Sequence, residues 1–151
     1  MRKALLLFAV LSLVGSIWAA DLHVGTWKMN TAKSKVVFGN QPPLKSDIVK
    51  FEELKNGIKL TSDFITPDGE AHHNECILKY DGKEYPCGER TMSFIKIDDY
   101  TFDQVRKKDG KVVATAQEVF SKDGKTITRT YTAKDEKGQN LFIDISVYEK
   151  Q

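Results

Sequence analysis

The sequence predicts an all-β fold: an antiparallel up-and-down meander of about ten strands closed into a barrel. Short runs rich in β-branched and aromatic residues alternate with turn signals, and none of the runs carries a helical stripe. A flat meander of this length would expose two edges, whereas a closed barrel exposes none. Five of the turn signals are Asn-Gly or Asp-Gly pairs, which favour tight hairpins: Asn56-Gly57, Asp68-Gly69, Asp81-Gly82, Asp109-Gly110 and Asp123-Gly124.

Residues 1–19 are predicted to be a secretory signal peptide. Arg2 and Lys3 precede an apolar run over residues 4–14 and a small-residue end at residues 17–20. Cleavage after residue 20 and a buried or membrane-lying helix are the alternatives. The run is shorter than the roughly 20 residues that span a bilayer. We therefore expect a secreted or periplasmic single domain over residues 20–151, without a membrane anchor.

The charge balance gives no reason to expect a nucleic-acid partner. The chain has 23 Lys and Arg residues against 21 Asp and Glu residues, and the leader holds two of the basic ones and no acid. The remainder is formally neutral, whereas phosphate binding needs a basic face.

The expected strands begin with the segment GTWKMN at residues 25–30. A loop is expected over residues 31–45, because Pro42-Pro43 interrupts any ladder there. This loop either forms a lid over a cavity or connects strands at the other end of the barrel. The later strands are expected at residues 46–54, 57–66, 71–80, 91–98, 100–107, 111–120, 125–133 and 140–150.

Cys76 and Cys87 are predicted to form a disulfide in an oxidising compartment. A two-residue hairpin at Asp81-Gly82 places the cysteines opposite each other, about 5.5 Å apart. A three-residue loop with a glycine bulge separates them. A redox-active thiol pair is the alternative, but no CxxC is present.

No metal and no cofactor are expected. His72 and His73 are adjacent in a strand, so they point to opposite faces. His72, Asn74 and Cys76 share one face and could form a metal site, but a disulfide would consume the cysteine. Haem binding through one histidine is a further alternative.

Enzyme activity is not expected, because the sequence contains no nucleophile elbow, zinc-protease motif or phosphate loop. Glu118 falls opposite Arg129 if the turn at Asp123-Gly124 has two residues. This pairing predicts a structural cross-strand ion pair.

Two strand faces carry a candidate ligand site. Tyr100, Phe102 and Arg106 share one face, and Arg129 and Tyr131 share a face two strands later. Rings and guanidinium groups together suit a small amphipathic acid. The alternative is that the arginines face solvent and the aromatics fill a closed core, since the sequence does not say which face is inside.

GTWK at residues 25–28 resembles the Gly-x-Trp signature of lipocalins, and together with VYEK at 147–150 it resembles fatty-acid-binding proteins. GTWKMNTAKSK is similar to secreted bacterial lipocalin-like proteins of unassigned function. The resemblance implies a calycin barrel in which Trp27 packs across the closed end, with Arg129 as its stacking partner. Unlike fatty-acid-binding proteins, the chain lacks a helix pair after the first strand. Ser146 also stands where their final-strand arginine would be.

The sequence therefore predicts a monomeric, non-catalytic protein that binds a small hydrophobic or amphipathic ligand. A protein-interaction module, such as a secreted inhibitor or surface adaptor using the barrel loops, is the second hypothesis. A haem- or metal-dependent enzyme is the third.

Overall fold

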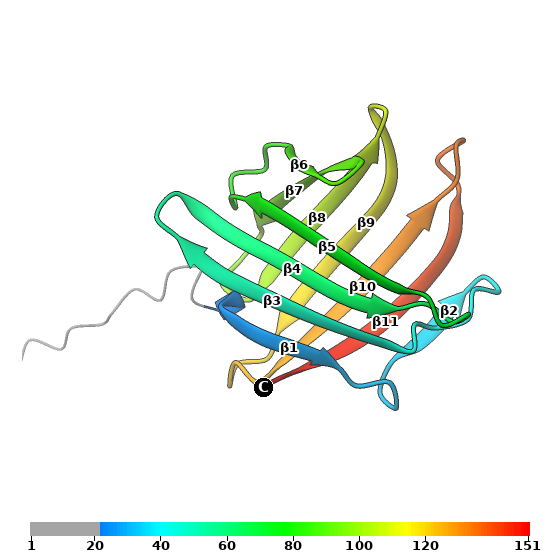
Figure 1. Ribbon diagram of the computed structural model, residues 1–151, viewed down its shortest axis with the longest axis horizontal. Coiled ribbons are helices and arrows are strands. Elements are labelled where there is room, and N and C mark those ends of the chain that lie inside the picture. Colours follow the sequence, from blue (N-terminus) through cyan, green and yellow to red (C-terminus); the bar gives the residue numbers. More distant parts are fainter. Residues whose placement is uncertain (1–21) are drawn as a thin grey trace, which may run out of the picture.

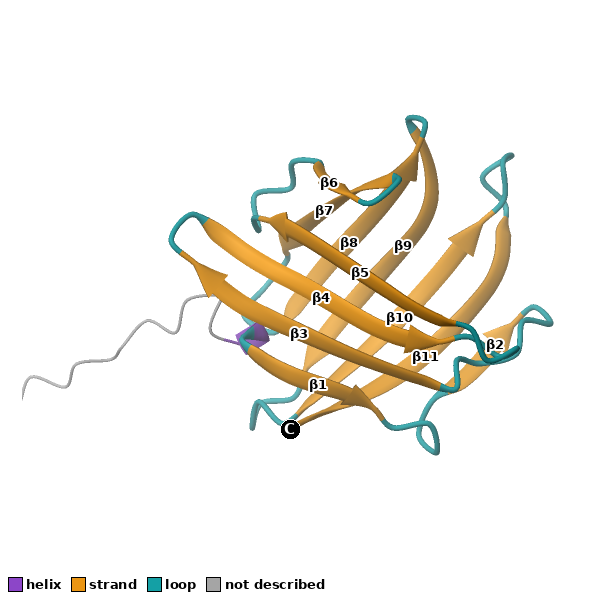
Figure 2. Cartoon of the chain, viewed as in Figure 1, coloured by secondary structure: helices purple, strands orange, loops and turns teal. Residues whose placement is uncertain are grey.

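The computed structural model describes residues 22–151, so the predicted signal peptide lies outside the described residues. Apart from one helical turn at residues 22–23, the regular structure is β (Figure 2). The strands are β1 Gly25–Met29, β2 Lys35–Phe38, β3 Ser46–Leu54, β4 Gly57–Ile65, β5 Ala71–Leu78, β6 Tyr85–Cys87, β7 Arg90–Lys96, β8 Thr101–Lys108, β9 Lys111–Phe120, β10 Thr126–Lys134 and β11 Asn140–Lys150.

All strands belong to one antiparallel sheet, and the predicted meander is confirmed. The sheet order is β5-β4-β3-β1-β11-β10-β9-β8-β7-β6, with β2 paired to β11 beside this path. In Figure 1, β3, β4 and β5 cross in front of β8–β11, so the sheet curls back over itself. The result is a nearly closed barrel. Among residues 22–151, no helix has the length and apolarity needed to cross a membrane.

The sequence predicted a loop over residues 31–45. This prediction is wrong in part, because the segment contains the strand β2. After β1 the chain turns and then pairs a second time with β11. Strand β1 pairs with β11 near Tyr148, and β2 pairs with β11 between Ile143 and Ile145. Strand formation here is local, since Val36 and Val37 favour extended backbone and the two prolines come only after β2.

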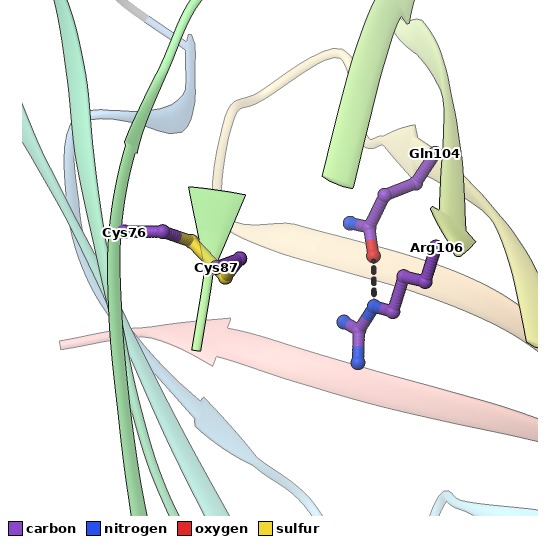
Figure 3. The surroundings of a disulfide bond; sticks show 4 residues. All are labelled: Cys76, Cys87, Gln104 and Arg106. Carbon is purple, nitrogen blue, oxygen red and sulfur yellow. Dashed lines mark hydrogen bonds between the residues drawn. A yellow bond between two sulfur atoms is a disulfide. The ribbon is translucent and has the colours of Figure 1, made fainter. Parts of the chain in front are cut away.

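The barrel fails to close between β5 and β6. Strand β5 pairs only with β4, and β6 pairs only with β7. The predicted disulfide between Cys76 and Cys87 is confirmed and joins these two strands, with a Cα–Cα distance of 4.9 Å (Figure 3). Neither of the two hairpin alternatives at Asp81-Gly82 is found, because Asp81 forms a bridge with Ile95 of β7 instead of starting a ladder with β5. The disulfide thus replaces the missing hydrogen-bonded ladder.

Two of the other turn signals set the register of the sheet. Asp109 and Gly110 both have positive φ, 50° and 75°, and they form a two-residue loop between Lys108 and Lys111. The loop at Asp123-Gly124 is longer than two residues, because Ser121 closes it by bonding to Thr126. The register is the one predicted all the same.

One end of the barrel is filled by an aromatic cluster that surrounds His23. Its rings come from the first strand, from four strands of the sheet and from the loop after β5, so they pack side chains distant in sequence against one another. The members of this aromatic cluster are Trp27, Phe51, Tyr80, Phe94, Phe102 and Phe120.

Replacing both Cys76 and Cys87 by serine should lower the free energy of unfolding by about 2–4 kcal/mol, because the cross-link restricts the unfolded chain. Urea denaturation followed by tryptophan fluorescence measures the change. Wild-type protein treated with a reductant should match the double variant. An unchanged midpoint on reduction would show that the disulfide contributes nothing to stability.

Candidate functional site

A cavity of about 790 Å³ occupies the half of the barrel beyond the aromatic cluster. Inward-facing side chains of β3, β4, β5, β8, β10 and β11 form its wall. The segment after β2 contributes Gln41, Pro43 and Leu44, and the turn between β6 and β7 contributes Gly88 and Glu89. Part of the predicted 31–45 loop therefore borders the cavity, as the lid alternative expected.

Small residues keep this half of the barrel hollow. Ala114 and Ala116 face inward from β9, where longer side chains would fill the space. Ser62 and Ser146 do the same from β4 and β11. On β9, the aromatic Phe120 lies at the other end of the strand, in the aromatic cluster. The change from small to large side chains along β9 thus helps to divide the interior into a packed end and an open end.

The floor of the cavity carries a charged group whose members bond to one another, although the buried Nε of Arg129 has no hydrogen-bond partner. The Arg129 guanidinium donates to Asp47 Oδ2 at 3.1 Å and to the Tyr148 hydroxyl. Tyr148 donates to the same Asp47 oxygen at 2.7 Å, and Ser62 donates to the other carboxylate oxygen at 3.0 Å. Only 12% of the Arg129 side chain is exposed. This arginine is therefore already neutralised.

Arg106 stands in the cavity wall without a carboxylate partner. Its Nε donates to Gln104 Oε1 at 2.9 Å, and its two terminal nitrogens point away from Gln104 (Figure 3). The guanidinium lies over the Tyr131 ring, with Cζ 5.4 Å from the ring centroid. Ala114 is opposite Arg106 on β9, and its small side chain leaves room for the arginine to extend across β9 to Tyr131 on β10. Within residues 22–151, no Asp or Glu forms an ion pair with Arg106.

The pKa values of the two arginines reflect this difference. Burial lowers the pKa of Arg129, but Tyr148, Asp47 and other acidic groups outweigh it, so the pKa lies above its ordinary value. Burial also lowers the pKa of Arg106, and there the neighbouring charges do not make up the difference. Arg106 remains a cation at neutral pH because an arginine keeps its proton. It is therefore a half-buried positive charge in the cavity wall with spare hydrogen-bond donors.

A second buried pair lies under the floor, within the aromatic cluster. His23 Nε2 lies 3.0 Å from Glu118 Oε2, and both side chains are almost fully buried. The backbone carbonyl of His23 accepts a bond from Trp27 Nε1 at 2.7 Å. Sequence reasoning missed this role of His23, because its partner is 95 residues away.

The predicted pairing of Glu118 with Arg129 is right in register and wrong in contact. The two residues are opposite each other on β9 and β10. Glu118 nevertheless bonds to His23, while Arg129 bonds to Asp47. Inside the barrel, Glu118 and Arg129 each lie within reach of side chains from other parts of the chain. Each therefore bonds to a partner other than the residue opposite it in the ladder.

The predicted stacking of Arg129 on Trp27 is also wrong. The cation over the Trp27 ring is Lys150, with Nζ 5.1 Å from the centroid, and Arg129 stacks over Tyr148 at 4.6 Å. Lys150 is paired directly with Trp27 in the β1–β11 ladder, which explains its position. Trp27 itself is fully buried at the packed end.

Of the five residues predicted to bind a ligand, the structure brings three together at the cavity: Arg106, Arg129 and Tyr131. Phe102 faces inward on the same strand as Arg106 but is fully buried in the aromatic cluster. Tyr100 precedes β8 and is 38% exposed. Neither of these two lines the cavity, because the shared face runs from the packed end to the open end.

His72 and His73 point to opposite faces, as the alternation of a strand requires. His72 lines the cavity and stacks on Phe64 at 4.9 Å. His73 contacts Asp63 at the outer surface, where His73 Nδ1 lies 2.6 Å from Asp63 Oδ1. Within residues 22–151, no three His, Cys, Asp or Glu side chains are grouped closely enough to hold a metal ion.

No known protein family matches this sequence, and no curated protein does. Several solved structures match this chain in their overall fold. The S-type phycobiliprotein lyase CPES from Guillardia theta superposes with a TM-score of 0.59 at 11% identity, covering 87% of this chain and 90% of that chain. The zebrafish ileal bile acid-binding protein complexed with cholic acid gives 0.49 at 12% identity, covering 86% and 99%. The superposition on the lyase shows that the two chains share an overall fold, in agreement with the barrel described above.

The buried carboxylate of Glu118 predicts a pH dependence of stability. Burial raises its pKa, but the hydrogen bond from His23 and the charges of His23, Arg129 and Arg106 outweigh this, so the folded-state pKa lies below the ordinary 4.5. A lowered carboxyl pKa contributes stability that is fully present above pH 4.5 and is lost as the pH falls through the folded-state value.

Glu118→Gln should lower the free energy of unfolding by about 1–3 kcal/mol at neutral pH. It should cost progressively less as the pH falls below 4.5. Urea denaturation at a series of pH values measures this difference. The exposed Glu53→Gln is the matched control. Wild-type and Glu118→Gln stabilities that run parallel across the acid range would contradict the assignment.

Proposed function

We propose that this protein is a secreted or periplasmic, non-catalytic carrier of a small amphipathic acid, a molecule with an apolar body and a carboxylate. The observation that carries the proposal is the unpaired guanidinium of Arg106 in the wall of the cavity. A partly desolvated cation with free donors is a favourable position for an anion. A carboxylate can accept two parallel bonds from its terminal nitrogens.

The size and lining of the cavity support this proposal. Its volume of about 790 Å³ lies within the range of small-molecule sites. Met29, Leu60, Met92 and Phe142 offer apolar contacts for the body of the ligand. A barrel acting only through its outer loops would have no need of such an interior, so this observation favours carriage over the protein-interaction hypothesis.

Arg129 has a supporting role in this proposal. Its bonds to Asp47 and Tyr148 hold it in place at the floor, and its charge is balanced there. Tyr131 orients the Arg106 guanidinium through its ring face, a contact worth about 0.5–2 kcal/mol. The anion would therefore meet Arg106 first.

Native mass spectrometry of protein purified without detergent provides the first test. A discrete added mass that disappears on denaturation supports carriage. A bare mass that persists after incubation with fatty acids, retinoids and haem would count against it and favour the protein-interaction module. Haem belongs among the probes because His72 lines the cavity.

Arg106→Gln should weaken the binding of dodecanoate by about ten- to a hundredfold, because a bond to a charged group contributes roughly 1.5–3 kcal/mol. Isothermal titration calorimetry measures the affinity. Lys111→Gln, which removes a positive charge at an exposed position, should leave it unchanged. Equal affinities for wild type and Arg106→Gln would refute the anchoring role of this arginine.

A further inference from the structure

The cavity holds an unpaired anion as well as an unpaired cation. The Asp144 side chain lines it from β11 and accepts one hydrogen bond, from the Ser146 hydroxyl at 2.6 Å. In the described chain from residue 22 onward, no lysine or arginine forms an ion pair with Asp144. The other inward carboxylate of this half, Asp47, is fully engaged by Arg129, Tyr148 and Ser62.

One aromatic ring stands between the two unpaired charges. Tyr131 is directly opposite Asp144 in the β10–β11 ladder, so their side chains lie side by side on the inner face. The Arg106 guanidinium covers the Tyr131 ring from the β8 side. The order across the wall is therefore cation, ring, anion.

A second ring flanks the anionic position. Phe142 precedes Asp144 by two residues on β11 and faces the cavity with it. The Phe142 and Tyr131 centroids are 5.9 Å apart, with ring planes inclined by 37°. A carboxylate beside two aromatic rings offers what an organic ammonium group requires: opposite charge and the negative faces of the rings.

We propose that the ligand is a zwitterionic amphiphile, with its carboxylate on Arg106 and an organic ammonium group at Asp144, Tyr131 and Phe142. This inference rests on the proposed function and narrows its ligand class. Charge complementarity carries it, because the wall offers unpaired groups of both signs: Arg106 and Asp144 flank one aromatic ring, and Lys35 and Arg90 line the cavity elsewhere. A simple fatty acid would complete Arg106 and leave Asp144 unpaired beside its own carboxylate.

Three probes with the same dodecyl tail separate the two proposals: dodecanoate, dodecyltrimethylammonium and the zwitterion dodecyldimethylammonio-butyrate, each below its micelle concentration. Calorimetry of the full mature chain measures the affinities. The zwitterion should bind about tenfold more tightly than dodecanoate, since it adds the ammonium contacts.

Asp144→Asn should remove this preference by weakening the zwitterion about tenfold, and it should bind dodecanoate at least as tightly as wild type because a repulsive charge is gone. Phe142→Leu keeps apolar volume and removes the ring face, so it should also weaken the zwitterion more than dodecanoate. Asp109→Asn is the matched control: it removes a carboxylate in the exposed β8–β9 turn, where asparagine tolerates the positive φ. Unfolding midpoints of all variants exclude misfolding as the cause.

The outcomes distinguish the two proposals. Dodecanoate binding that depends on Arg106, with no preference for the zwitterion or no effect of Asp144→Asn, overturns the zwitterion and leaves carriage of an acid in place. Binding of none of the three probes overturns both. Preferential binding of dodecyltrimethylammonium with no role for Arg106 also overturns both, since the anion site would then be unused.

Discussion

The aromatic cluster around His23 is the feature on which the rest of the interior depends. Its rings fill one end of the barrel from strands that are far apart in sequence, and this burial supplies the apolar stabilisation that holds the sheet curled. Toward the other end, β3 and β8 carry Asp47 and Arg106, and β4 and β11 carry Ser62 and Ser146. The packed end therefore stabilises the barrel so that the open end can remain hollow.

The charged side chains of the interior are paired at the packed end of the barrel and include unpaired ones at the open end. Glu118 bonds to His23 deep in the cluster, and Arg129, Asp47 and Tyr148 bond to one another at the cavity floor, so the charges of both groups are balanced. Only beyond the floor does an arginine occur that no carboxylate completes. An unbalanced, half-buried charge in the wall of a cavity indicates where a ligand would complete the site.

The disulfide joins two strands between which backbone hydrogen bonding is lost. Strands β5 and β6 do not pair, and Cys76 and Cys87 join them at the border of the cavity. The cross-link therefore has a structural role beyond restricting the unfolded chain: it fixes the spacing of two strands that carry His72 and the turn at Gly88 and Glu89. This explains why a barrel can leave a ladder incomplete without opening its side.

The sequence by itself determined the meander, most of the strands, the disulfide partners and the register that places Glu118 opposite Arg129, because alternation and turn chemistry act between near neighbours. It did not show β2, since two prolines nearby hid a strand formed just before them. Only the tertiary structure decided which face of each strand is inside and which charges pair. Glu118 bonds to His23, and Arg129 to Asp47, because closure brings together side chains that are 95 and 82 residues apart. Arg106 and Asp144 were left unpaired by the same process, and no local pattern encodes what a long side chain will reach across a closed barrel.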